Sequence, residues 1–191
     1  MRAIIAVVGD THVDRNSEKW ELAVSLGKSL VDAGFRIVSG GLGDLPRALA
    51  EGARKSKDYQ DGSLIAIIPS YDPADAESNA DIVIATGLDH ARNLIVANSD
   101  AVIVIGGGAG TLSEIAFAWS LKRLIIALNT PGWGEKLINT RLDNRVRYPD
   151  IRDDKIYGAN SVEDTTQKLV LLLPHYTNRH SRILVRRAKE W

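Results

Sequence analysis

The sequence predicts a three-layer α/β fold, in which an open parallel sheet carries helices on both faces. Short runs rich in β-branched residues alternate along the chain with longer stretches whose apolar residues recur at helical spacing, which is typical of βα units. Several of the short runs are apolar throughout, as expected for strands that helices cover on both faces. Glycines follow three of these runs, and in a parallel sheet such turns lie at one common edge.

The strands are expected where the apolar, β-branched runs occur. These runs are residues 3–8, 36–39, 64–68, 82–85, 101–105 and 124–128, with a further short strand at 155–157. The first run is too short for the apolar region of a signal peptide, and it ends in Gly9 and Asp10. We therefore interpret it as a strand.

The helices are expected to begin near Ser17, Leu45, Asp89, Thr111 and Ser161, and the last to end at Leu173. Asn16 or Ser17 can cap the first helix, and Gly34 follows its end. Gly27 lies inside that helix, where a missing side chain indicates close packing, and we expect its partner to be the sheet.

The chain is predicted to form a single domain over residues 1–174, followed by a basic C-terminal tail at 175–191. Residues 129–154 contain glycine, proline and many charges, and we interpret them as an ordered excursion rather than a linker. In the tail, Ile183, Leu184 and Val185 indicate a docking strand or helix at a subunit interface.

The composition excludes several classes of function. The 191 residues include 24 basic and 24 acidic side chains, so no overall positive field favours nucleic acid, and a contact of the short tail with RNA is a minor alternative. The absence of cysteine excludes disulfides and thiolate catalysis, and it fits a cytoplasmic location. No apolar stretch approaches the roughly 18 residues of a membrane span.

The glycine turns predict an anion site at the sheet edge. Glycine allows backbone amides to approach a ligand, and a helix that starts near Thr111 would direct its free amides and positive dipole at a phosphate. The expected phosphate-binding residues are Gly9, Gly40, Gly41, Gly107, Gly108, Ala109, Gly110 and Thr111. The alternative is that these glycines only permit tight connections. The pattern matches neither a P-loop nor the dinucleotide fingerprint.

Two charged residues near this edge are candidates for chemistry. Glu114 follows Thr111 by one helical turn, although an acidic residue there also favours the helix dipole on its own. Arg92 lies at the start of the preceding helix, where a cation is unfavourable, which indicates an anionic partner. The alternative for Arg92 is a surface salt bridge with Asp89.

Three further residues have open interpretations. His90 is an acid–base candidate or a surface residue, Asp10 binds a ribose hydroxyl or caps a turn, and Trp133 stacks on a base or covers the edge of the core. We expect no metal site, because no cluster of histidine and carboxylate residues has the spacing of metal ligands.

The stretch from Arg92 and Asn93 through residues 99–105 to Gly106–Glu114 resembles the Lonely Guy superfamily, whose signature is P-G-G-x-G-T-x-x-E. The order of elements is similar over residues 1–130. The resemblance implies a Rossmann-like fold, cleavage of the N-glycosidic bond of nucleoside 5′-monophosphates, and a homodimer or homotetramer. It implies that the glycine loop holds the phosphate, that Glu114 stabilises charge at C1′ or positions water, and that Arg92 orients the nucleotide.

Two departures from the signature leave the function open. Gly106 stands in place of proline, and Asn93 in place of lysine, which is similar to the branch that includes molybdenum-cofactor carrier proteins. The remaining interpretations are a phosphoribohydrolase, a carrier that binds a phosphorylated pterin or nucleotide without turnover, and a nucleotide sensor. No cofactor is required, and the expected ligand is a nucleotide or a molybdopterin-type molecule.

Overall fold

The computed structural model describes residues 2–76 and 78–179. Seven parallel strands form one sheet in the order β4-β3-β2-β1-β5-β6-β7. They are β1 (Ile4–Gly9), β2 (Arg36–Ser39), β3 (Leu64–Ile68), β4 (Ile82–Ala85), β5 (Ala101–Ile105), β6 (Leu124–Leu128) and β7 (Tyr157–Ala159). The predicted α/β class with a parallel sheet is confirmed.

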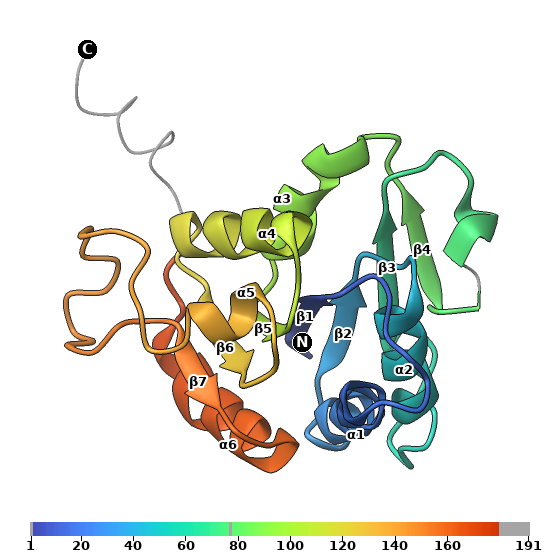
Figure 1. Ribbon diagram of the computed structural model, residues 1–191, viewed down its shortest axis with the longest axis horizontal. Helices are drawn as coiled ribbons and strands as arrows, with labels where there is room; N and C mark the ends of the chain where they lie inside the picture. The colour runs from blue at the N-terminus through green and yellow to red at the C-terminus, as the bar shows by residue number, and fades with distance from the viewer. Residues whose placement is uncertain (1, 77, 180–191) are drawn as a thin grey trace.

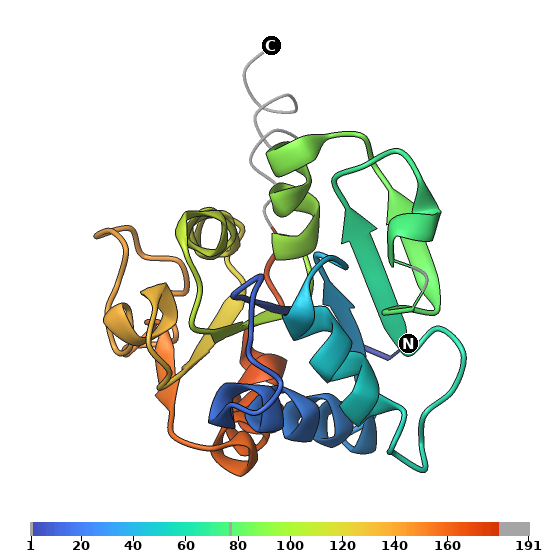
Figure 2. The same cartoon turned by 45° about the vertical axis from the view of Figure 1, so that its right-hand side comes forward.

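The helices form two layers, one on each face of the sheet (Figures 1 and 2). They are α1 (Glu18–Asp32), α2 (Asp44–Ala53), α3 (Asn93–Ala97), α4 (Ala109–Ser120), α5 (Trp133–Lys136) and α6 (Val162–Leu172), with 3₁₀ turns at Pro73–Ala76, Asp89–Arg92 and Leu173–His175. One layer holds α1, α2 and α6, and the other holds α3, α4 and α5. Each layer packs on its own apolar cluster, so the core is double.

Five strands have the predicted bounds, and β1 begins and ends one residue later than predicted. The last strand lies two residues beyond its predicted position. The reason is that Ile156 pairs with the preceding excursion, where its amide donates to Thr140 and its carbonyl accepts from Asn139. Only from Tyr157 onward is the backbone free to join β6.

The predicted helix near Asp89 begins as a 3₁₀ turn, and α3 proper starts at Asn93. Asp89 has a φ of 50°, which is outside the helical region. The first helix starts as predicted, because the Ser17 hydroxyl accepts a hydrogen bond from the Trp20 amide. Gly34 follows α1 with a φ of 83°, as expected after a helix end.

Gly27 marks a close approach, but its partner is α2 and not the sheet, which corrects our expectation. A Cβ atom at Gly27 would lie 2.2 Å from the carbonyl oxygen of Leu49, and one at Gly52 would lie 1.7 Å from that of Val24. The two glycines therefore let α1 and α2 pack backbone against backbone on the sheet.

The excursion at residues 129–154 is ordered around a buried ion pair. The Arg147 guanidinium binds the Asp154 carboxylate, with Nη2 and Oδ1 2.5 Å apart, and lies 3.7 Å from the Trp119 ring centroid. Arg147 also donates to the carbonyl of Arg123, and the Tyr176 hydroxyl donates to Asp154. A buried pair with all these partners ties the excursion to α4 and to the end of the domain.

The predicted docking segment at Ile183, Leu184 and Val185 lies outside the described residues. Just before it, Arg179 pairs with Asp100 at the amino end of β5. Within residues 2–76 and 78–179, no helix has the length and apolar character needed to cross a membrane.

The contact between α1 and α2 can be tested by filling one glycine. We expect Gly52→Ala to lower the free energy of unfolding by about 2 kcal/mol, because the new methyl group collides with backbone that cannot move alone. Urea denaturation measures the change. Arg47→Ala on the exposed side of the same helix is the control and should stay within about 0.5 kcal/mol. A Gly52→Ala variant as stable as its parent would contradict the close packing.

Candidate functional site

A pocket of about 480 Å³ lies at the carboxyl edge of the sheet, between the ends of β1 and β5. The order of the strands reverses here: β2, β3 and β4 follow one another on one side of β1, and β5, β6 and β7 follow one another on its other side. Loops at such a switch point diverge and leave a crevice, where ligands bind in open α/β sheets. Its walls are residues 9–12, 90, 92–93, 108–111 and 114.

The amino end of α4 forms one wall of this pocket. Gly108 precedes the helix, and no side chain of residues 2–76 or 78–179 caps the amides of the first turn. Ala109, Gly110 and Thr111 follow it along the same wall, and an added Cβ at Gly108 or Gly110 would meet no atom within 4 Å. The first-turn amides and the helix dipole thus form an anion-binding surface with space in front of it.

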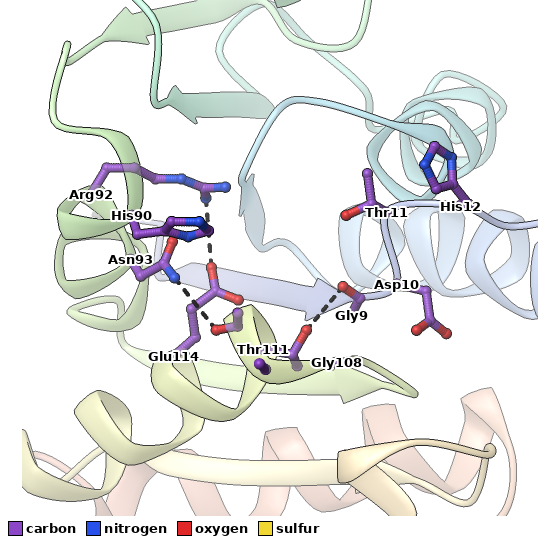
Figure 3. A pocket seen from close by; sticks show the side chains of 12 residues that line it. Gly9, Asp10, Thr11, His12, His90, Arg92, Asn93, Gly108, Thr111 and Glu114 are labelled. Carbon is purple, nitrogen blue, oxygen red and sulfur yellow. Dashed lines mark hydrogen bonds and ion pairs between the residues drawn. The ribbon is translucent and has the colours of Figure 1, made fainter.

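Thr111 connects this wall to the first strand. Its hydroxyl donates to the Gly9 carbonyl at 3.0 Å, and the side chain is buried (Figure 3). The hydrogen bond therefore holds the end of β1 against the start of α4. Of the eight residues predicted to bind phosphate, Gly9, Gly108, Ala109, Gly110 and Thr111 line the pocket.

Gly107 is next to the pocket, but its amide is already in use. It donates to the Asp10 carboxylate at 3.0 Å, while the Gly107 carbonyl accepts from the Trp133 amide at 3.0 Å. The preceding residue, Gly106, has a φ of 65°, and proline is restricted to a φ near −65°. The loop therefore has a conformation that the proline of the Lonely Guy signature could not adopt.

Glu114, one helical turn beyond Thr111 on the wall formed by α4, meets Arg92 from the opposite wall, as Figure 3 shows. Arg92 Nη1 lies 3.5 Å from Glu114 Oε1, and their side chains are only 17% and 9% exposed. The alternative pairing of Arg92 with Asp89 is therefore wrong. In the described part of the chain, neither Arg92 Nε nor Nη1 has a hydrogen-bond partner.

Burial controls the ionisation of this pair. Desolvation raises the pKa of Glu114 to about 7, although the charge of Arg92 acts in the opposite direction. Burial also lowers the pKa of Arg92, against the effect of Glu114. A carboxyl group that changes charge near neutral pH inside a pocket is typical of a functional site.

Gly40 and Gly41 do not line the pocket, and Gly40 acts on it through Arg92. A Cβ atom at Gly40 would lie 2.5 Å from Arg92 Nη1, so this glycine makes room for the guanidinium in a small hollow behind the ion pair. Gly41 is buried with a φ of 75°, and its carbonyl accepts from Asn79. Gly41 does not line the pocket.

Asn93 connects α3 to α4. Its side-chain amide donates to the Ser113 hydroxyl at 2.8 Å and to the Gly110 carbonyl at 3.4 Å. At the position where the Lonely Guy enzymes carry lysine, this chain thus has a structural hydrogen bond in place of a cation. Arg92 is the one arginine or lysine among the lining residues in the described chain.

The remaining candidates divide between the pocket and the core. Asp10 and the exposed His90 line the pocket, whereas Trp133 packs on the apolar cluster beneath α4, in agreement with its interpretation as a cover for the core. Thr11 and His12 also line the pocket, and they were not among the candidate site residues predicted from the sequence. They directly follow Gly9 and Asp10 in a glycine turn that was predicted to lie at the sheet edge, and this position could have indicated that they line the site. Among the described residues, no group of three or more histidines and carboxylates could hold a metal ion.

The sheet order, the crevice between β1 and β5 and the start of α4 define a Rossmann-like protein with a pocket at the carboxyl edge of its sheet. The chain belongs to the SLOG cluster4 family, whose model matches residues 2–163. This agrees with the predicted resemblance to the Lonely Guy superfamily, in the branch that includes molybdenum-cofactor carrier proteins.

Individual proteins of known sequence are similar to the chain over most of the domain. An uncharacterised protein of Archaeoglobus fulgidus is 39% identical over 66% of this chain and 80% of its own. The cytokinin riboside 5′-monophosphate phosphoribohydrolase of Mycobacterium tuberculosis is 27% identical over 62% of this chain and 61% of its own, so the match spans less than two thirds of that enzyme.

Solved structures give a similar result over nearly the whole chain. The molybdenum cofactor binding protein of Rippkaea orientalis is 27% identical with a TM-score of 0.72, covering 91% of this chain and 98% of its own. The molybdenum cofactor carrier protein of Chlamydomonas reinhardtii is 25% identical with the same TM-score, covering 91% and 99%. The chain is thus similar both to a nucleotide hydrolase and to cofactor-binding proteins.

The dependence of the ion pair on Gly40 gives a direct test. Gly40→Ala should push the guanidinium of Arg92 away from Glu114 and raise the pKa of Glu114 further above 7, since the nearby positive charge lowers it. A ¹³C NMR titration of the Glu114 carboxyl measures this pKa. Gly108→Ala, where an added methyl group meets nothing, is the matched control. An unchanged pKa in Gly40→Ala would contradict the role of Gly40.

Proposed function

We propose that the pocket binds the 5′-phosphate of a nucleoside monophosphate and that Glu114 assists hydrolysis of its N-glycosidic bond. The observation that carries this proposal is the Glu114 carboxyl group. It is nine-tenths buried, accepts no hydrogen bond from any described residue, and faces the same pocket as the uncapped start of α4. Among the described residues its close partner is Arg92, in an ion pair at 3.5 Å without a hydrogen bond, so its oxygens are available to a ligand.

The chemistry follows from the two ends of the pocket. The first-turn amides of α4 receive the phosphate, which places the ribose toward Glu114, one helical turn further along the same wall. As the bond between C1′ and the base lengthens, positive charge develops on the ribose ring, and a nearby carboxylate stabilises it. The base leaves with the bonding electron pair as water adds to C1′, and the proton that the water loses passes to the carboxylate and from it to the base, which regenerates the carboxylate.

Arg92 has two roles in this scheme. Its charge keeps part of the Glu114 population ionised at neutral pH, and its unpaired guanidinium nitrogens can donate to ribose or phosphate oxygens. The similarity to the phosphoribohydrolase of Mycobacterium tuberculosis supports the reaction class. The homodimer or homotetramer and the cytoplasmic location stay predictions.

A second candidate function is a carrier for molybdenum cofactor or a related phosphorylated pterin. Two observations favour it: Gly106 has a φ that excludes the signature proline, and Asn93 replaces a cation with a structural hydrogen bond. The similarity to the proteins of Rippkaea orientalis and Chlamydomonas reinhardtii supports the same alternative. Under this proposal, the pocket holds the phosphate in the same way and no bond is broken.

The variant Glu114→Gln distinguishes the hydrolase from the carrier. We expect the parent to release free base and ribose 5-phosphate from at least one member of a nucleoside 5′-monophosphate panel, and Glu114→Gln to lose at least about 100-fold in rate, since the amide supplies no negative charge. Chromatography of the products measures release, and calorimetry measures binding of the nucleotide. Base release that persists in Glu114→Gln would contradict the catalytic role, whereas binding of nucleotide or pterin without any release by the parent would favour the carrier.

The reaction should also depend on pH through Glu114. The active form is the carboxylate, and its pKa in the free protein is about 7, so kcat/KM should be constant above that pH and fall about tenfold per pH unit below it. Measuring kcat/KM between about pH 5.5 and 8.5 follows this titration, and a separate titration of the free nucleotide identifies the contribution of its phosphate. A plateau that extends down to the acid end of that range would show that no carboxyl group with a raised pKa takes part.

A further inference from the structure

The turn that precedes the anion-binding end of α4 is held by an ion pair from a different part of the chain. Asp10, at the end of β1, accepts the Gly107 amide through Oδ1 at 3.0 Å and the Lys19 ammonium through Oδ2 at 2.5 Å. Lys19 also donates to the Pro131 carbonyl at 3.3 Å. One pair of side chains thus links the loops that follow β1, β5 and β6.

The backbone at Gly106 is shaped to fit this pair. A Cβ atom there would lie 2.4 Å from Asp10 Oδ2 and 2.8 Å from Lys19 Nζ, and the Gly106 carbonyl accepts from the Gly134 amide at 2.9 Å. The loop is held on one side by Asp10 and on the other by the first turn of α5. Only a residue without a side chain fits between these two supports.

The pair also sets the charge of the pocket. Asp10 lines the pocket and is partly exposed to it, whereas Lys19 is not among the lining residues. A lone carboxylate at this position would repel a phosphate group. Lys19 lies in the first turn of α1, where a cation is unfavourable to the helix dipole, so its placement is explained by Asp10 rather than by its own helix.

We propose that Asp10 and Lys19 are positioning residues of the anion site: Asp10 sets the conformation of the glycine loop, and Lys19 cancels the negative charge that Asp10 brings to the pocket. This inference rests on the proposed function for its ligand, a phosphate monoester. Among the amides of the glycine loop, it assigns the phosphate to those of residues 108–111, because Asp10 occupies the amide of Gly107.

The charge effect is tested with four forms of the full chain: the parent, Lys19→Met, Asp10→Asn, and the double variant. We expect Lys19→Met to weaken binding of adenosine 5′-monophosphate about tenfold, because it leaves a negative charge facing the phosphate. The double variant should return to the affinity of the parent, since the side-chain amide introduced by Asp10→Asn keeps an acceptor for the Gly107 amide and carries no charge. Asp10→Asn alone should bind more tightly than the parent.

A matched control lies on the same helix. Lys28 pairs with Asp32 at 2.5 Å, away from the pocket, so Lys28→Met makes the same change in charge and should leave the affinity unchanged. If Lys19 contacted the phosphate itself, the double variant would stay as weak as Lys19→Met, and that result would overturn the proposal. Affinities are measured by calorimetry at low and at high salt. The loss in Lys19→Met should shrink at high salt, as a charge effect requires.

The positioning effect is tested without any ligand, which keeps it distinct from the proposed function. Amide hydrogen exchange at Gly107 should be protected in the parent and in Asp10→Asn, and should accelerate at least about tenfold in Asp10→Ala, where the acceptor is removed. Unchanged protection in Asp10→Ala would overturn the positioning role, whatever the pocket binds. A parent that binds no phosphate ester would overturn the proposed function and the charge role of Lys19, while the exchange result would still decide the role of Asp10.

Discussion

The parallel pairing of β1 with β5 is the constraint on which the site depends. These two strands are far apart in the chain and adjacent at the centre of the sheet, with Ile5 opposite Ala101 and Gly9 opposite Ile105. Gly9 has no room for a side chain, since an added Cβ would lie 2.2 Å from the Ile105 carbonyl oxygen. The ladder brings the turn after β1 against the start of α4, and the Thr111 hydroxyl joins them. Without this register, the walls of the pocket would not face each other.

The pair of Arg92 and Glu114 shows how the fold keeps an ionisable group in a buried place. A buried ion pair gains little stability when its remaining donors and acceptors have no partners, because desolvation offsets the attraction. Here the two charged groups are 3.5 Å apart, and two nitrogens of Arg92 have no partner among the described residues. The attraction between the charges therefore offsets only part of the cost of their desolvation. Gly40 permits this arrangement by leaving space for the guanidinium. The energetic cost is consistent with a site that is completed by a ligand.

The glycine loop connects the two proposed functions with the local chemistry of the chain. In this protein Gly106 leaves the space that Asp10 and Lys19 occupy, and Asn93 forms a hydrogen bond to Ser113 where the Lonely Guy signature has a lysine. These differences lie near the start of α4, whereas Glu114, one turn further along, is retained. Under both proposals the pocket holds a phosphorylated ligand, and they differ in whether Glu114 takes part in bond cleavage.

The sequence by itself determined the fold class and five strands to the residue, and it indicated that Arg92, Glu114 and the loop at Gly108–Thr111 lie near one edge of the sheet, because apolar periodicity and glycine turns are local properties of the chain. What it could not determine was which groups meet. Three such contacts join segments that are distant in the chain. Gly27 packs on α2, Gly40 leaves space for Arg92, and Asp10 accepts a hydrogen bond from the Gly107 amide. Only the tertiary structure decides these contacts, since they depend on strand order and helix packing, which no local pattern encodes.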